Sequence, residues 1–142
     1  MILTANAATP ATLVPEARRM SFLPGLFGRK LILVGERTVY QFMSLLAPDD
    51  YTVGMWHFHE LGGQPLFLSP AAEKRFRISC ETNGYQGEVS AEAAGLIATL
   101  FALSHLSFQQ ESDQLADAYL RLCAVDFHPE LSRVFHRELS HL

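Results

Sequence analysis

The stretch MWHFHELGG, residues 55–63, places His57 and His59 two positions apart and Glu60 directly after the second histidine. Two imidazoles at this spacing could supply ligands to a zinc ion, or a histidine and Glu60 could exchange protons with a substrate. A catalytic zinc site needs three protein ligands and a structural site needs four, so the pair is not sufficient by itself. Whether it does chemistry depends on the elements that position it.

Side chains alternate between the two faces of a strand, and this rule separates the residues of the stretch. Trp56, Phe58 and Glu60 fall on one face, which their bulk marks as the core face. We expect His57 and His59 on the opposite, solvated face. Glu60, near the end of the strand, is expected to accept hydrogen bonds from the backbone or from a turn.

The residues expected beside the two histidines do not favour a metal ion. Alternation in a later strand places Arg75, Arg77 and Ser79 on the same open face, and arginines repel a cation. No third ligand is evident on that face. Two alternatives stay open: a small metal-dependent hydrolase that uses the two histidines, and a nucleic-acid-binding module that uses Trp56 with both arginines.

Three segments with strand-like composition surround these residues: VGMWHFHEL (53–61), PLFLSP (65–70) and RFRISCE (75–81). The turn residues of GGQP separate the first two segments, and SPAAEK links the second to the third. We expect the three to pair in chain order as an antiparallel meander. NGYQGE, residues 83–88, follows the third segment and contains Asn-Gly, which predicts a loop.

Helical patterns precede and follow these strands. Apolar residues at helical spacing predict a helix from Glu36 to about residue 46, while LILV (31–34) before it fits a helix or a strand. Ser90 and Ser112 are suitable N-caps for two later helices. The remaining expectations are a short helix over 15–20, a turn or single helical turn over 21–28, helices over 90–108 and 112–127, and a last helix after Pro129 with Leu131, Val134, Phe135 and Leu139 on one side.

Helices before and after a small antiparallel sheet are typical of the α+β class. We therefore expect one α+β domain over residues 13–142, in which a three-stranded antiparallel sheet (about 53–61, 65–70 and 75–81) packs with several flanking α-helices. Residues 1–12 are expected to be a flexible lead-in. A single domain suits the length of 142 residues, which is enough for a hydrophobic core without disulfides or metals.

Composition argues against several classes of protein. The net charge is −4, from 15 acidic residues against 11 lysines and arginines, which is not the basic footprint of a nucleic-acid-binding protein. The apolar run over 93–108 is shorter than the ~20 residues that span a bilayer, so it predicts a buried core helix and no membrane segment. Cys80 and Cys123 lie among apolar residues and are expected to be reduced core thiols of a cytoplasmic protein.

Several blocks of the sequence resemble the KlcA/ArdB family of plasmid-borne antirestriction proteins. They are ATLVPEARRMSFLPGLFG (11–28), the W-x-F-x-E-L pattern that ends at Leu61, FLSP (67–70), RFRIS (75–79) and NGYQGEVSAEAAGL (83–96). The resemblance covers about residues 11–108, with the blocks in the family's order. It departs at GGQP, where an Asn-Gly hairpin is expected. The two histidines occupy the variable positions of the strand pattern, which also disfavours a metal site.

The resemblance implies a function that no catalytic motif in the chain would have indicated. Members of this family protect incoming plasmid DNA against type I restriction–modification systems of the host, and no catalytic residue is carried over from them. The implied partner is the host type I restriction–modification machinery, reached directly or through a host factor. We expect no enzymatic activity, no cofactor, no bound metal, no stable DNA binding and no membrane association, and we expect a monomer.

One inhibitory mechanism can be tested against the composition. A protein that imitates DNA should present carboxylates at about the density of phosphates, roughly one charge per 1.7 Å of duplex axis. The acidic residues of this chain are diluted by basic ones and scattered, with no run longer than Asp49-Asp50. We therefore expect an inhibitor that acts by protein interaction and not by DNA mimicry.

Two surfaces are candidates for binding the partner. The first is the open sheet face predicted to carry His57, His59, Arg75 and Arg77. The second is the predicted loop over 83–88, in which Tyr85 is a large side chain flanked by polar residues. The candidate partner-binding residues are therefore His57, His59, Arg75, Arg77, Asn83, Tyr85 and Glu88, alongside the alternative that both surfaces are purely structural.

Overall fold

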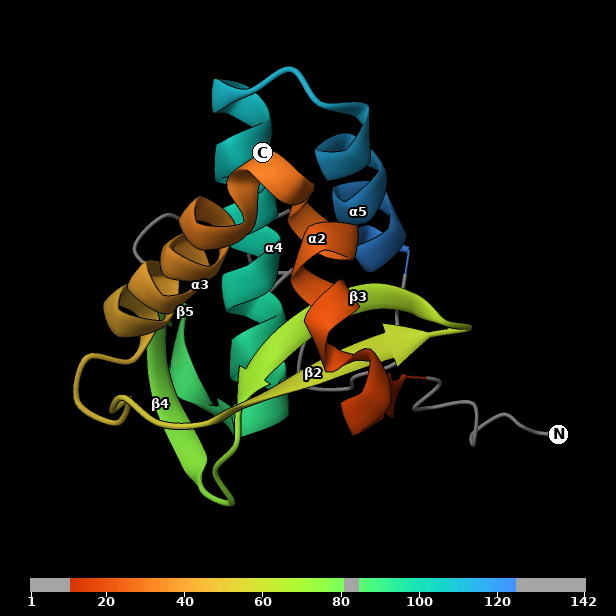
Figure 1. Cartoon of the computed structure of the whole chain (residues 1–142). Coiled ribbons are helices and arrows are strands. Elements are labelled where there is room, and N and C mark those ends of the chain that lie inside the picture. The colour runs from red at the N-terminus through yellow and green to blue at the C-terminus, as the bar shows by residue number, and fades with distance from the viewer. Residues whose placement is uncertain (1–10, 81–84, 125–142) are drawn as a thin grey trace, which may run out of the picture.

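Residues 11–80 and 85–124 are described by the computed structural model of the chain, with Tyr85 described through its backbone alone. Most of the expected lead-in, Asn83 in the expected loop, and the helix expected after Pro129 lie outside these residues. The elements in chain order, with η marking 3-10 helices, are β1 (Thr12–Leu13), η1 (Glu16–Ser21), α2 (Phe22–Phe27), η2 (Arg29–Leu31), α3 (Ile32–Leu46), β2 (Trp56–Leu61), β3 (Gln64–Pro70), β4 (Arg75–Cys80), β5 (Tyr85–Ser90), α4 (Ala91–Gln109) and α5 (Asp113–Cys123) (Figure 1).

The predicted α+β class is confirmed, and local sequence signals explain where the helices begin. Ser90 accepts a hydrogen bond from the Ala93 N–H at 3.1 Å, and Ser112 accepts one from the Leu115 N–H at 3.2 Å. Both predicted N-caps are therefore confirmed. Residues 32–34 are the first turn of α3, so the helical alternative for this segment is correct.

The strands form two sheets, and the expected three-stranded meander is wrong in its third strand. All three predicted strands exist, but only β2 and β3 pair with each other. The third member of their sheet is β1, where Thr12 is paired with Glu60 and Leu13 with His59. β4 pairs with β5 in a separate sheet. Four of the six residues expected as a loop, 85–88, therefore belong to a strand.

The outer edge of β3 is covered by a helix, which explains why β4 does not pair there. Thr99 of α4 accepts a hydrogen bond from the Leu68 N–H at 3.2 Å and donates one to the Gly95 carbonyl at 2.8 Å. Gly95 lets the helix approach this closely, because a Cβ there would overlap Leu68 O and the Ser69 Cα. The helix thus satisfies a strand-edge donor that a neighbouring strand would otherwise use.

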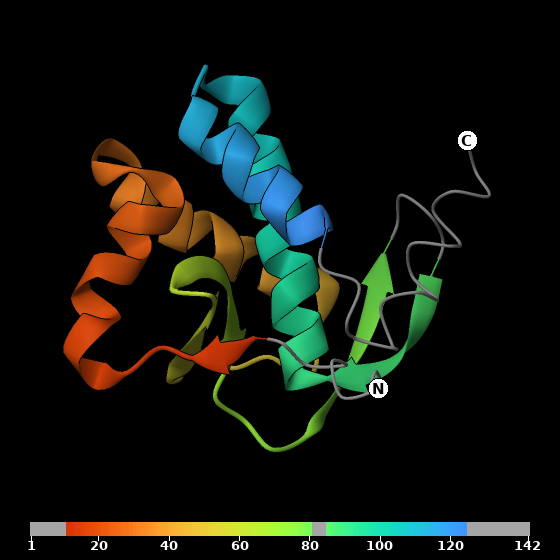
Figure 2. The same cartoon turned by 90° about the vertical axis from the view of Figure 1, so that its right-hand side faces the viewer.

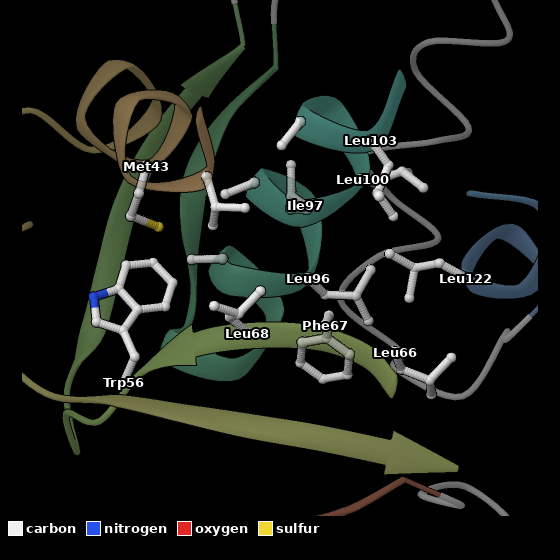
Figure 3. Packing of buried hydrophobic residues seen from close by; sticks show 14 of the residues in the cluster. Met43, Trp56, Leu66, Phe67, Leu68, Leu96, Ile97, Leu100, Leu103 and Leu122 are labelled. Carbon is white, nitrogen blue, oxygen red and sulfur yellow. The ribbon is translucent and has the colours of Figure 1, made fainter. Parts of the chain in front are cut away.

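The hydrophobic core is built around α4, which the other elements surround (Figures 1 and 2). Leu96, Leu100 and Leu103 lie on the side that faces Leu122 of α5, and Met43 of α3 packs from another side (Figure 3). α4 is long and apolar enough to cross a membrane, but 67% of its apolar window is buried inside the fold. It is the core helix that the sequence predicts.

The two cysteines have different environments. Cys80 ends β4 and is buried, as expected. Cys123 ends α5 and is exposed, so the prediction of a core thiol is wrong for this residue. The reason is helical geometry: Leu122 faces the core, and the next position is rotated by about 100° away from it.

Candidate functional site

His57 and His59 lie on the same face of β2 but differ in exposure. His57 is exposed, whereas 5% of the His59 surface is accessible, so the prediction of a solvated face is wrong for His59. β1 and β3 flank this residue on both sides. Its ring stacks on Phe67 at 4.2 Å between centroids, and its Nε2 lies 2.8 Å from the Ser69 Oγ. Burial, followed by the charge of His57, lowers the pKa of His59 to about 4.

Glu60 has a different partner from the one expected. Its carboxylate accepts two hydrogen bonds from Arg18, with Nη1–Oε1 at 2.8 Å and Nη2–Oε2 at 2.6 Å. The partner is therefore a guanidinium of η1 and not a backbone or turn donor. Arg19 reinforces the contact, because its guanidinium lies 4.2 Å from the centroid of the Phe58 ring. Together these contacts hold η1 against β2.

A cleft of about 530 Å³ opens beside the two histidines, and we call it the polar cleft. It lies where β1 and β2 meet the loop from β3 to β4 and the first turn of α4. His57 and His59 line it from β2, Lys74 from the loop before β4, Arg75 from the first position of β4, and Glu92 from α4. Three residues of the predicted open face are therefore brought together, although they belong to two different sheets.

The other residues of the predicted open face lie elsewhere. Arg77 is exposed on β4 opposite Glu88 of β5, and it does not line the polar cleft. Its backbone N–H donates to the Asp50 Oδ2 at 2.7 Å, which ties β4 to the loop after α3. The prediction of a shared face is therefore wrong for Arg77, because β4 pairs with β5 and does not belong to the sheet that carries the histidines.

The second predicted surface is described only in part. Glu88 is exposed, and its carbonyl accepts a hydrogen bond from the Arg75 Nη2 at 2.9 Å, while its carboxylate lies 3.9 Å from the Arg75 Nε. Glu88 thus helps to position a residue of the polar cleft. Tyr85 pairs with Cys80 at the start of β5 through its backbone. Asn83 lies outside the described residues.

The polar cleft contains a Ser–His pair, and its geometry does not favour nucleophilic catalysis. Ser69 and His59 are at hydrogen-bond distance, as a nucleophile and its base would be. However, Ser69 is almost fully buried, and the lowered pKa makes His59 a weak base. Glu60, the neighbouring carboxylate, is held by Arg18. The hydrogen bond between Ser69 and His59 therefore joins β2 to β3.

The described residues support neither the metal-dependent hydrolase nor the nucleic-acid-binding module that the sequence left open. Within residues 11–80 and 85–124, no group of three or more His, Cys, Asp or Glu side chains is placed to hold a metal ion. Trp56 is buried against Tyr40 and Tyr51, with ring centroids at 4.8 and 5.8 Å. Its ring is therefore not available to stack on a nucleic-acid base beside Arg75 and Arg77.

Sequence reasoning missed several residues of this region. Lys74 lines the polar cleft, yet its position in a loop gave it no assignable face. Ser69 binds His59 across the sheet, a contact that requires the register of β2 and β3. Arg18 lies 42 positions before Glu60, and no local pattern connects the two. Only Glu92, an acid in the first turn of a predicted helix, carries a sequence signal.

A family model, related sequences and a solved structure all relate this chain to antirestriction proteins. The family model described as antirestriction protein matches residues 49–137. Two Escherichia coli proteins named antirestriction protein KlcA are similar to this chain. One is 37% identical over 138 residues (93% of this chain, 96% of the relative), and the other is 39% identical over 132 residues (88% of this chain, 90% of the relative).

A solved structure also matches, with a TM-score of 0.77 and 36% identity over 92% of this chain and 96% of that one. It comes from the KlcA and ArdB proteins, which are described as having a novel fold and antirestriction activity against type I DNA restriction systems in vivo but not in vitro. The match extends over nearly the whole of both chains, in sequence as well as in fold. This chain belongs to the antirestriction protein family.

Proposed function

We propose that this protein counteracts a type I restriction–modification system in the cytoplasm of its host, without catalysis and without imitating DNA. The observation that carries the proposal is the match to the KlcA and ArdB structure over 92% of this chain and 96% of that one. A relationship of this extent, at 36% identity, supports the same activity and not the fold alone. The protein acts as a monomer.

The distribution of charge supports a mechanism other than DNA mimicry. Several carboxylates already face cationic or donor groups of the same chain. Glu60 is bound by Arg18, Glu88 lies beside Arg75, and Asp50 accepts a backbone N–H. Acids that are paired internally and scattered among 11 basic residues do not form a stripe at phosphate density.

The behaviour described for the relatives supports action through a host factor. The KlcA and ArdB proteins act against type I systems in vivo but not in vitro. A direct competitor for the DNA-binding groove would also inhibit the purified enzyme. We therefore propose that this chain binds a cellular protein on which restriction depends.

The polar cleft is the proposed binding surface for that protein. It carries exposed His57, Lys74 and Arg75 at its rim, together with the acid Glu92. Charges of both signs around a concave surface favour specific pairing with a protein, because each misplaced charge on a wrong partner is penalised. Tyr85 and Arg77 stay candidates for a second contact beyond the polar cleft.

Plating of unmodified phage on a host with an active type I system tests the proposal. Expression of the protein should raise the plating efficiency toward that of modified phage. Lys74→Ala with Arg75→Ala should lower this protection, while Arg29→Ala with Lys30→Ala, which removes two exposed basic residues of η2, should not. Circular dichroism would establish that both variants fold.

A cleavage assay with the purified type I enzyme separates the two parts of the proposal. The protein alone should leave cleavage unchanged, and addition of host extract should produce inhibition. Inhibition without extract would contradict the need for a host factor. Absence of protection in the plating assay, with the protein expressed and folded, would contradict the proposed function as a whole.

A further inference from the structure

An apolar groove of about 400 Å³ lies on the side of the molecule formed by α3, α4 and the end of β4. Phe42 and Leu45 line it from α3, and Phe101 and Phe108 line it from α4. Phe42 and Phe101 contact each other with ring centroids 5.9 Å apart. Phe108 is 90% exposed and Leu45 is 72% exposed, although both are large apolar side chains.

An open apolar groove of this kind is a candidate binding surface, because monomers rarely expose contiguous apolar patches larger than a few hundred Å². The proposed function makes no use of it: the polar cleft is lined by a separate set of residues. The occupant of the groove is therefore either another segment of this chain or a separate molecule.

The chain itself supplies a segment with the matching pattern. Residues 125–142 follow α5, and the sequence predicts an amphipathic helix after Pro129. Its apolar residues Leu131, Val134, Phe135 and Leu139 recur at the spacing of one helical face. The family match continues to residue 137, so this segment belongs to the family's common domain and is not an appended tail. An apolar helical face needs an apolar surface to cover it.

We propose that the groove between α3, α4 and β4 is the docking site of the C-terminal segment 129–142. The dimensions agree. Positions 131 to 139 of a helix extend about 12 Å, and the lining residues of α4, from 101 to 108, extend about 10 Å.

The connection is also long enough. α5 and α3 both pack against α4, on different sides of it (Figures 1 and 2). The groove is lined from the α3 side of α4. The segment therefore has to pass around one helix about 10–12 Å in diameter, and half of its circumference is roughly 16–19 Å. The six residues that precede Leu131, numbers 125–130, reach roughly 20 Å when fully extended.

An intramolecular occupant is favoured over a second copy of the chain. A segment joined by a short linker has an effective concentration of about millimolar at its own groove. A second copy of the protein would have to be present at about millimolar concentration to compete, which is far above the concentrations usual in solution. The docked segment would cover Phe108 and Leu45, and it would leave the polar cleft open to a partner.

Photo-crosslinking in the full-length protein distinguishes the occupants. Phe108 is replaced by p-benzoylphenylalanine, which its exposure allows, and the products are mapped by mass spectrometry. Crosslinks within one chain to residues 129–142 are expected. A covalent dimer as the main product would overturn the proposal in favour of a second copy. Products without any link to residues 129–142 would also overturn it. The same crosslinker at Met20, an equally exposed residue of η1, is the control and should not reach this segment.

A pair of matched variants tests whether the apolar face is responsible. Phe135→Asp places a charge on that face and should lower the yield of the intramolecular crosslink by about tenfold or more. Ser140→Asp places the same charge on the opposite face of the predicted helix and should leave the yield unchanged. Equal yields from both variants would overturn the assignment, and circular dichroism would check that both retain the fold.

Discussion

At the scale of single residues, the most informative feature is the contrast between two neighbouring histidines. His57 is exposed at the rim of the polar cleft, whereas His59 is buried, stacked on Phe67 and bonded to Ser69. Both are imidazoles on one face of one strand. Their roles differ because β1 pairs beside position 59 but does not reach position 57, whereas β3 pairs with both positions.

Alanine substitutions should separate these roles. His59→Ala removes a buried ring and leaves the Ser69 hydroxyl without this partner, so it should lower the free energy of unfolding by about 2–4 kcal/mol. His57→Ala should change it by less than about 0.5 kcal/mol, as is usual for exposed side chains. Urea unfolding at pH 7 measures both values. Equal stability of the two variants would contradict the burial assigned to His59.

The lowered pKa of His59 predicts how stability depends on pH. An unfolded histidine titrates near 6.5, and burial lowers the pKa of His59 to about 4 in the folded protein. Between these two pH values the unfolded state binds a proton that the folded state does not. The contribution of neutral His59 to the free energy of unfolding is therefore fully present above pH 6.5 and is lost as the pH falls toward 4. The shift corresponds to roughly 3 kcal/mol.

This loss can be isolated by comparing the wild-type protein with His59→Gln. Unfolding free energies measured from pH 7 to pH 4 should converge for the two proteins as the pH falls, because the variant lacks the titrating group. Parallel curves over this range would show that the pKa of His59 is not lowered in the folded protein.

At the scale of elements, the packing of α4 on β3 determines the topology. Gly95 allows the helix backbone to reach Leu68 and Ser69, and Thr99 then accepts the Leu68 N–H. Helix propensity alone would favour alanine over glycine by about 1 kcal/mol. Glycine at this position is therefore explained by close approach and not by local helix formation.

Gly95→Ala should consequently destabilise the protein in spite of the better helix propensity. The added Cβ meets backbone atoms of β3, which cannot rotate away as a flexible side chain could. We expect a loss of at least about 3 kcal/mol in unfolding free energy, above the range for ordinary overpacking. Gly54→Ala is the matched control, since its Cβ would meet only the Thr52 carbonyl at 4.0 Å. A stabilised Gly95→Ala protein would contradict the contact.

At the scale of the whole molecule, the balance of charge bears on the mechanism. The net charge of −4 is small, and the acids at positions 60 and 88 face arginines of the same chain. We therefore expect that this protein does not compete with a duplex for a binding groove through charge density.

A gel-shift experiment with a purified type I enzyme and its DNA tests this conclusion. Added protein should leave the enzyme–DNA complex intact, even at low salt, where competition by a DNA mimic would be strongest. Displacement that weakens as the salt concentration rises would contradict the proposed mechanism and indicate mimicry.

The sequence by itself determined the local features of this protein. Alternation placed Trp56 and Phe58 in the core, and the serine N-caps located the starts of α4 and α5. Apolar periodicity predicted α3, and the apolar run over 93–108 predicted the buried core helix. Each of these signals depends on residues a few positions apart, so it can be recognised within one short stretch of sequence. The ordered blocks that resemble the KlcA/ArdB family added the function, which no single site displays.

Only the tertiary structure decided how these elements combine. The strand at 75–80 pairs with β5 because α4 occupies the edge of β3, and this moved Arg77 away from the histidines while Arg75 stayed beside them. The burial of His59 follows from neighbours on β1 and β3, and the partner of Glu60 comes from η1. These contacts join distant parts of the chain, and their energies depend on which surfaces meet. A pattern within one segment therefore cannot reveal them.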